Sequence, residues 1–313
     1  MYSAPTIRTK FLVISDTHGR ESSLQHLSTE CADVAIHCGD LTTDSTLAEF
    51  RSSISFLSSL NTPLKLVIAG NHDFTLDTPT FQRKLALASE ILDPALVKKA
   101  YGDFGYARSL FEEAMDNGIK FLDQGTHHFT LENGASLTVY ASPYTPSMSP
   151  GDWGFEYSRS HGHNFEFKHV DVVITHGPPK GIMDYNMDRE RAGCPELFAA
   201  VRRAKPRMHC FGHINEQWGA KLVTWRKGSP SREPCHFGDV DHRNSFVIER
   251  LSNLQGEKED EEYERFYRTS HCTGDEGPVK WEEQTLFVNA AIEGVDGRTQ
   301  PAWVVEIELS RAF

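Results

Sequence analysis

Aspartate, histidine and asparagine recur directly after short apolar runs in this sequence. Five segments carry them: Ser15–Gly19, His37–Asp40, Gly70–Asp73, Thr175–Pro179 and Phe211–Asn215. Imidazole nitrogens combined with carboxylate and amide oxygens suit Zn, Fe or Mn. A carboxylate can bridge two ions, and two ions roughly 3.5–4 Å apart can clamp the attacking and leaving oxygens of phosphoryl transfer. These residue types therefore predict a metal centre suited to that chemistry.

The apolar runs that precede these segments are predicted strands. They are rich in Val, Ile and Leu and comprise Phe11–Ile14, Val34–Ile36, Leu64–Ala69, Val172–Thr175 and Met208–Phe211. Continuous apolar runs of this length are typical of strands buried on both faces. Open α/β sheets place their ligand crevice at the carboxyl ends of such strands. We therefore expect the five polar segments to lie close together.

Helical patterns and a hairpin lie between the predicted strands. The expected helices are Thr46–Leu60 (capped by Asp44 or Ser45), Pro79–Leu92, Ala107–Asn117 and a helix near Pro195–Arg203. Asn133-Gly134 predicts a hairpin turn between Phe129–Leu131 and Leu137–Tyr140. Further strand-like pieces occur at Ser245–Ile248, Thr285–Asn289 and Trp303–Ile307. The alternation predicts an α/β fold with mixed sheets.

Composition narrows the class of protein. The chain has 313 residues and a formal net charge of −12, which argues against binding extended nucleic acid or an anionic membrane. Six cysteines form no dense framework, and the N-terminal apolar run is too short for a signal peptide, so we expect a cytoplasmic protein. Residues 227–280 are polar and include an acidic run at 257–264. We interpret residues 1–313 as a single domain that carries this insertion.

The ordered set of motifs resembles the calcineurin-like metallophosphoesterase superfamily over roughly residues 10–225. Ser142-Pro143, Asp152–Phe155, Thr175–Pro179, Gly193–Leu197 and Phe287–Ala290 look like the metallophosphoesterase-domain-containing branch. The resemblance implies a two-sheet β-sandwich flanked by helices (αββα), with a dinuclear metal site at its edge. It also implies two divalent ions, which would be Mn, Fe or Zn, with Mg as a further candidate.

The resemblance also implies a role for each motif residue. Asp16 and His18 would bind metal one, Asp40 would bridge both ions, and Asn71, His176 and His213 would bind metal two. His72 would contact the phosphate and protonate or stabilise the leaving oxygen, and Asp73 would hold its ring. A bridging water that has lost a proton would be the nucleophile. This set of roles predicts hydrolysis of a phosphate ester without a covalent enzyme intermediate.

One position departs from the superfamily pattern. The last motif is normally Gly-His-x-His, and its second His binds metal one, but here Asn215 takes that place. An amide oxygen is a weaker ligand for Zn or Fe than imidazole. The site could work with Mn or Mg, which accept oxygen ligands. Alternatively it holds one ion firmly and is a weakly active nucleotide- or metal-binding protein; we expect the working enzyme.

The sequence also narrows the substrate. Protein phosphatases of the superfamily follow Gly-Asp with an arginine-containing motif, which is missing after Gly39-Asp40. The branch resemblance favours a small phosphodiester such as a cyclic nucleotide; a phosphomonoesterase with the same site is the alternative. Tyr144 and Trp153 could stack a nucleobase, or Trp153 could simply pin its loop to the core. Asn71 and His72 complete the expected substrate-binding set.

Overall fold

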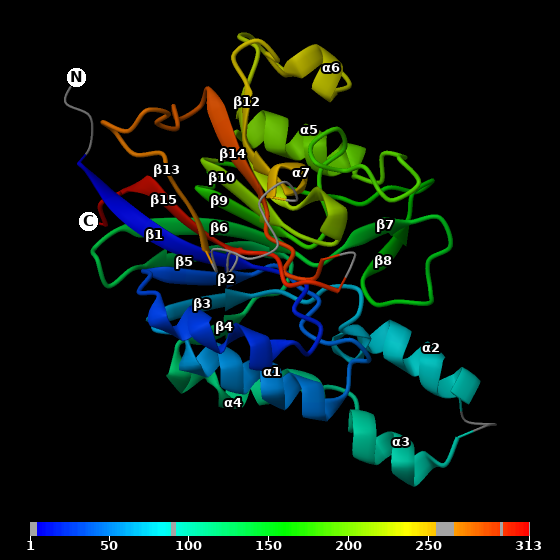
Figure 1. Cartoon of the computed structure of the whole chain (residues 1–313). Coiled ribbons are helices and arrows are strands. Elements are labelled where there is room, and N and C mark those ends of the chain that lie inside the picture. The colour runs from blue at the N-terminus through cyan, green and yellow to red at the C-terminus, as the bar shows by residue number, and fades with distance from the viewer. Residues whose placement is uncertain (1–4, 89–91, 255–265, 295–296, 313) are drawn as a thin grey trace.

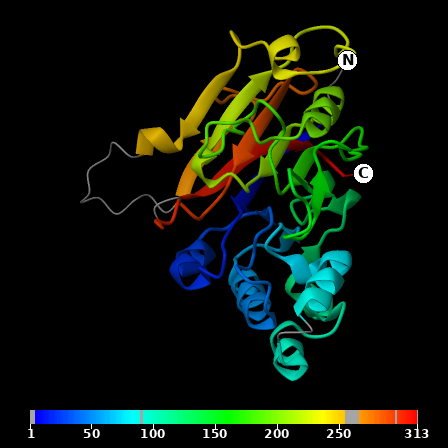
Figure 2. The ribbon, with the colours of Figure 1, turned by 90° about the vertical axis from the view of Figure 1, so that its right-hand side faces the viewer.

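The computed structural model describes residues 5–88, 92–254, 266–294 and 297–312, which form two large mixed β-sheets and a short two-stranded ribbon. The sheets pack face to face, and helices cover the outer face of each (Figures 1 and 2). This architecture confirms the predicted α/β sandwich.

The first sheet contains strands from the beginning and from the end of the sequence. Its strands, in spatial order, are β13 (Phe266–Ser270), β15 (Ala302–Ser310), β1 (Thr6–Ile14), β2 (Val34–His37), β3 (Leu64–Val67) and β4 (Ile119–Phe121). β1 pairs antiparallel with β15 and parallel with β2, and β2 pairs parallel with β3. The parallel strands β1, β2 and β3 therefore end at the same edge of the sheet.

The second sheet contributes the other two site-bearing strands. Its order is β12 (Phe246–Arg250), β11 (Gly219–Thr224), β14 (Gln284–Asn289), β10 (Met208–Phe211), β9 (Val172–Thr175), β6 (Ser136–Ser142) and β5 (Gly125–Thr130). β6, β9, β10 and β14 run parallel. The predicted Asn133-Gly134 hairpin joins β5 to β6. The ribbon pairs β7 (Thr145–Ser147) with β8 (Glu156–Ser158).

Successive side chains of a strand point to opposite faces of its sheet, and this alternation explains how the sheets and helices pack in layers. In β1, Phe11 and Val13 face the core between the sheets, whereas Leu12 and Ile14 pack under the helices α1 (Leu47–Ser59) and α4 (Tyr106–Glu113). In β9, Val173 faces outward against α5 (Pro195–Ala204). Both faces of Phe11–Ile14 in β1 and of β9 are buried, which is why these segments are continuous apolar runs in the sequence.

Helix ends differ from the predictions in detail. Thr46, rather than Asp44 or Ser45, caps α1 by a reciprocal capping box with Glu49. Ala107–Asn117 splits into α4 and a 3₁₀ turn that Gly118 ends at a φ of 75°. Short helices α6 (His236–Asp239) and α7 (Leu251–Leu254) follow β11 and β12.

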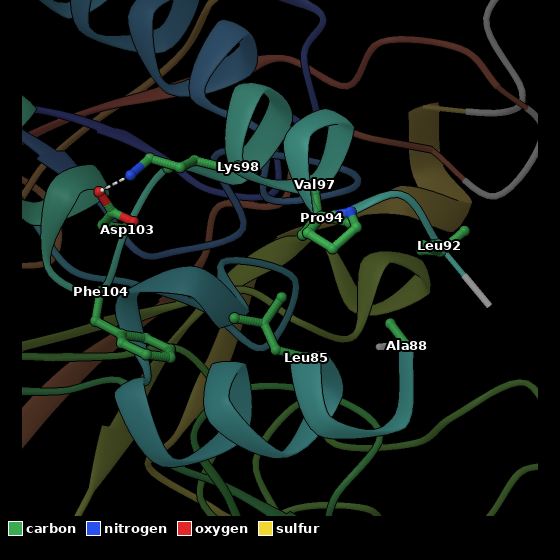
Figure 3. A pocket seen from close by; sticks show the side chains of 9 residues that line it. Leu85, Ala88, Leu92, Pro94, Val97, Lys98, Asp103 and Phe104 are labelled. Carbon is green, nitrogen blue, oxygen red and sulfur yellow. Dashed lines mark ion pairs between the residues drawn. The ribbon is translucent and has the colours of Figure 1, made fainter. Parts of the chain in front are cut away.

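The helix predicted at Pro79–Leu92 corresponds to α2 (Thr78–Ala88), and residues 89–91 lie outside the described residues. A further helix, α3 (Pro94–Tyr101), was not predicted. α2 and α3 line an open apolar pocket of about 250 Å³, to which Leu85, Val97 and Phe104 contribute (Figure 3). None of the predicted metal ligands lines this pocket.

Residues 227–280 include two edge strands. β12 pairs with β11 in the second sheet, and β13 pairs with β15 in the first. The acidic run at 257–264 lies outside the described residues, and the assignment of one domain with an insertion stays a prediction. No helix in the described part of the chain is long and apolar enough to cross a bilayer. The cytoplasmic location also stays a prediction.

Candidate metal centre

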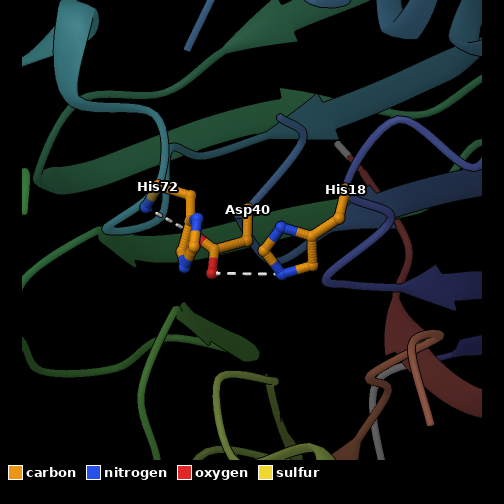
Figure 4. Close-up of side chains that lie close together, drawn as sticks. All are labelled: His18, Asp40 and His72. Carbon is orange, nitrogen blue, oxygen red and sulfur yellow. Dashed lines mark hydrogen bonds and ion pairs between the residues drawn. The ribbon is translucent and has the colours of Figure 1, made fainter. Parts of the chain in front are cut away.

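The loops that follow β1, β2, β3, β9 and β10 meet at one edge of the sandwich. Among the described residues, two groups of side chains have ligand atoms within 4.8 Å of one another: His18, Asp40 and His72, and Asp40, His176 and His213. Figure 4 shows the first group, with His18 and His72 on opposite sides of Asp40. Because Asp40 belongs to both groups, its carboxylate lies where it could bridge two ions.

The spacing of the ligand atoms fits divalent ions. Asp40 Oδ2 lies 3.3 Å from His176 Nε2 and 3.6 Å from His18 Nε2. Two atoms that bind one ion at about 2.1 Å lie about 3.0–3.6 Å apart for bond angles of about 90–120°. Asn71 Oδ1 also lies 2.9 Å from His176 Nε2. The expected ligands of metal two thus converge around His176.

Carbonyl oxygens of the loop after β2 orient the imidazole rings. The Nδ1 atoms of His176, His18 and His72 each lie 2.9 Å from a backbone oxygen, those of Cys38, Thr42 and Thr43 respectively. A carbonyl only accepts, so each Nδ1 carries a proton and each Nε2 faces the centre. Metal-binding histidines characteristically have such a partner on the other ring nitrogen.

The backbone at the site is strained. Asp16, His18, Asp40 and His213 have φ values of 54°, 43°, 55° and 67°. This left-handed region is sparsely populated by residues other than glycine, and such strain concentrates at functional sites. Asp16 also accepts hydrogen bonds from the backbone N–H of His213 at 3.0 and 3.1 Å. This contact links the loop after β1 to the loop after β10.

Two glycines allow these loops to approach one another. A Cβ on Gly70 would lie 2.2 Å from Asp40 Oδ1 and 2.7 Å from His176 Cε1. A Cβ on Gly212 would lie 1.9 Å from Asp16 Oδ2. The Gly-Asn-His-Asp and Gly-His motifs therefore need glycine because ligand side chains occupy the space of a methyl group.

His72 is held with one ring nitrogen free. Its backbone N–H donates to Asp40 Oδ1 at 2.8 Å, and its ring stacks on Trp153 with centroids 4.1 Å apart. Nδ1 faces the carbonyl of Thr43, and Nε2 has no hydrogen-bond partner among the described residues. His72 can therefore offer Nε2 to a bound phosphate ester.

Asp73 does not hold the His72 ring, which corrects the expected pairing. Its buried carboxylate accepts hydrogen bonds from the backbone N–H groups of Leu41, Thr42 and Gly70 and from the Thr42 hydroxyl, at 2.7–3.2 Å. Burial raises the pKa of Asp73 to about 6. In the described structure, Asp73 is therefore a positioning residue that ties the loop after β3 to the loop after β2.

The side chain of Asn215 has the surroundings expected of a metal ligand. Its side-chain Oδ1 is buried and has no hydrogen-bond partner within the described part of the chain. A buried acceptor without a donor is energetically unfavourable, and a cation would satisfy it. The backbone here is fixed by Asn289, which donates to the oxygen of Ile214 at 2.9 Å, and by Gln300, which donates to the oxygen of Asn215 at 3.0 Å.

Comparison with protein families identifies the fold. The family model described as calcineurin-like phosphoesterase matches residues 9–217, which include every expected metal ligand. The chain belongs to this family. Phosphoesterases of this family use divalent metal ions, in agreement with the ligand set described above.

Two curated relatives illustrate how far the similarity extends. Metallophosphoesterase domain-containing protein 1 of Homo sapiens is 34% identical over 217 residues, which are 67% of this chain and 62% of that protein. Probable rhamnogalacturonate lyase C of Emericella nidulans is 30% identical over 243 residues, 76% of this chain but only 20% of that protein. The crystal structure of TT1561 of Thermus thermophilus matches with a TM-score of 0.42 and 11% identity, over 69% of this chain and 84% of that one.

Charges in the candidate metal site are already arranged for a cation. Burial lowers the pKa of His176, but Asp40 and Asp16 outweigh it and raise that pKa to about 9. Burial raises the pKa of Asp40, but His176 and His18 outweigh it and hold that pKa well below its usual range. Burial lowers the pKa of His213 to about 3, so this ring is neutral. An ion bound here would displace the proton that His176 carries.

The two aromatic residues expected to bind substrate lie in different places. Trp153 stacks directly on His72, at the edge of the candidate metal site. Tyr144 stacks on His163 with centroids 4.4 Å apart and meets Phe155 edge-on at 5.7 Å. Among the described residues, Tyr144 has no ring contact with an expected ligand.

The sequence did not lead us to expect Glu293 near the candidate metal site. This residue lies four positions beyond the end of β14, and its Oε2 is 3.6 Å from His18 Nε2. Arg20 holds its other carboxylate oxygen at 2.5 Å. No motif marks Glu293, and the only signal for it was its place shortly after a strand that ends beside β10 at the same edge.

Proposed function

We propose that this protein is a metal-dependent phosphoesterase that hydrolyses a small phosphodiester, with a cyclic nucleotide as the specific substrate class. The observation that carries the proposal is the position of His72. Its ring lies in one group with the candidate ligands His18 and Asp40, while its Nε2 is free among the described residues. A free imidazole beside an ion-binding cluster is the arrangement that general acid catalysis on a bound ester requires.

The proposal divides the ligands between two ions. One set is Asp16, His18, Asp40 and Asn215, and the other is Asp40, Asn71, His176 and His213. When bound, Mn, Fe, Zn or Mg ions supply positive charge for the phosphate oxygens and an activated water. In this proposal the ester phosphate approaches from the side of His72 and Trp153, because His72 Nε2 has no hydrogen-bond partner among the described residues.

His72 protonates the leaving oxygen in this mechanism. The carbonyl of Thr43 fixes the proton on Nδ1, so a second proton on Nε2 is the one available for transfer. The stacked indole of Trp153 and the edge of His18, whose ring centroid is 4.7 Å away, restrict rotation of the His72 ring. Nε2 therefore points in one direction before substrate arrives.

The charges near the site favour a diester over a monoester. A monoester carries a dianionic phosphoryl group and needs more positive charge than the monoanionic diester. Arg20 is paired with Glu293, and Arg159 donates to the backbone oxygens of Ala192 and Gly193. Both arginines are therefore occupied, and Trp153 offers an apolar surface for an organic leaving group.

The test is turnover of bis(p-nitrophenyl) phosphate beside p-nitrophenyl phosphate by ion-stripped protein titrated with Mn, Zn and Mg. A panel of 2′,3′- and 3′,5′-cyclic nucleotides follows. We expect metal-dependent turnover of the diester, and a fall in kcat of about 10²–10⁴ in His72→Gln. The matched control is His128→Gln, which replaces an exposed histidine on β5.

Other outcomes would reject the proposal in distinct ways. Preference for the monoester would make the protein a phosphomonoesterase. Tight ion or nucleotide binding without turnover, with activity appearing in Asn215→His, would indicate a weakly active binding protein. Unchanged turnover in His72→Gln would exclude the general acid.

A further inference from the structure

We propose that Glu293 is a ligand of metal one and supplies the strong donor that the chain lacks at Asn215. The inference rests on the metal site of the proposed function, but not on its substrate. Glu293 lies outside the matched family region, residues 9–217.

The first support is distance. Glu293 Oε2 lies 3.6 Å from His18 Nε2, the same separation as Asp40 Oδ2 from that nitrogen. Both separations lie within the span of about 3.0–3.6 Å that two ligands of one ion show. His18 Nε2 thus lies 3.6 Å from a carboxylate oxygen of Asp40 and 3.6 Å from one of Glu293. These three side chains do not all have ligand atoms within 4.8 Å of one another, so a shared ion would have to draw the two carboxylates together.

The second support is orientation. Arg20 Nη2 binds Glu293 Oε1 at 2.5 Å, and Arg20 Nη1 donates to the oxygen of Gly297 at 2.9 Å. The arginine thereby anchors one carboxylate oxygen and leaves Oε2 directed to His18. Ligands in metal sites are characteristically oriented by such a second partner.

The third support connects Glu293 to Asn215. The side-chain Nε2 of buried Gln300 donates to the backbone oxygen of Asn215 at 3.0 Å and to that of Glu293 at 2.9 Å. The Gln300 side chain therefore holds the backbone at Asn215 and the backbone at Glu293 close together at the same edge of the sandwich. Asn215 Oδ1, buried and without a partner in the described structure, is an acceptor that a cation at this edge would satisfy.

The resulting donor set has a chemical consequence. Metal one would have carboxylate oxygens from Asp16, Asp40 and Glu293, the amide oxygen of Asn215 and a single imidazole from His18. Metal two would have two imidazoles, from His176 and His213. Oxygen-rich sets favour Mn or Mg over Zn. Mn²⁺ is therefore the appropriate probe for the contribution of Glu293.

The experiment measures Mn²⁺ binding to the ion-stripped full chain by calorimetry and by electron paramagnetic resonance of free Mn²⁺. Glu293→Gln removes the charge but keeps the shape. We expect the wild type to bind two ions, and the variant to bind one of them about 10–100-fold more weakly. Asn215→His in the Glu293→Gln background should restore the weakened site. Glu132→Gln, an exposed change in the β5–β6 turn, should match the wild type.

Two outcomes would overturn the inference. One is wild-type affinity for both ions in Glu293→Gln. The other is equal weakening of both sites with a lower unfolding temperature of the ion-free protein, which would show that Glu293 only pairs with Arg20 and His18. Neither outcome depends on turnover, so a protein that binds two ions but hydrolyses no ester would reject the proposed function and leave this inference standing.

Discussion

Replacing Gly70 with alanine tests whether loop spacing sets the metal centre. The added Cβ would lie 2.2 Å from Asp40 Oδ1, 2.3 Å from the Asp40 backbone nitrogen and 2.7 Å from His176 Cε1. The φ of Gly70 is outside the left-handed region, so alanine can adopt the backbone conformation. The substitution therefore perturbs the site by steric contact and not by backbone strain.

The size of the effect follows from these distances. The carboxylate of Asp40 must move by about 1 Å to reach ordinary van der Waals contact, and its backbone nitrogen must move with it. A displacement of about 1 Å at a reacting site reduces rates about 10²-fold, or about 2.7 kcal/mol. We expect a comparable loss of affinity for the ions that Asp40 contacts. Overpacking should also lower the free energy of unfolding by about 1–3 kcal/mol.

The assay is calorimetric titration of ion-stripped Gly70→Ala with Mn²⁺ and Zn²⁺, with circular dichroism to show that the variant is folded. Gly238→Ala is the matched control, because its Cβ would meet only Cys235 Sγ, at 3.6 Å. If folded Gly70→Ala bound both ions as tightly as Gly238→Ala, the idea that close loop packing builds the site would be refuted.

Three further predictions concern the same chain. Trp153→Leu should reduce kcat about 2–10-fold at unchanged metal content, because it removes the ring stacked on His72. Asp239→Asn removes the carboxylate that pairs with buried Arg202 and should lower the free energy of unfolding in urea by about 3–5 kcal/mol. Hydrogen bonds from Ser231 outweigh burial and lower the pKa of Asp239, so this difference should shrink below about pH 4. Removal of bound divalent ions by a chelator should lower the unfolding temperature of the wild type but not that of Asp40→Asn, because the variant lacks the shared carboxylate ligand.

The site-bearing strands were predictable because they are buried on both faces. Phe11–Ile14 and Met208–Phe211 have few polar residues, so their sequence alone distinguishes them from surface segments. β11 and β13 were missed for the opposite reason. β11 contains Lys221 in its centre, and β13 is an edge strand of partly exposed residues, so their strand structure depends on neighbours distant in the sequence.

The ligand loops were also predictable, whereas some contacts within them were not. A polar residue at a strand end is visible in the sequence, and Asp40, His176 and His213 indeed meet. The direction of a side chain depends on loop backbones that other loops constrain. Glu293 illustrates this limit, because only the three-dimensional path after β14 brings it to His18.

The loop after β3 contains three adjacent residues, Asn71, His72 and Asp73, whose side chains have different contacts. Asn71 turns to His176, His72 turns to Thr43 and Trp153, and Asp73 turns inward to the loop after β2. Consecutive side chains leave the backbone in different directions, so they cannot all face one ligand. Since Asp73 is fully buried, its hydrogen bonds fix the separation of two loops that carry ligands. Asp40 therefore faces the candidate ligand groups, whereas Asp73 has a structural role, although both residues follow predicted strands in the sequence.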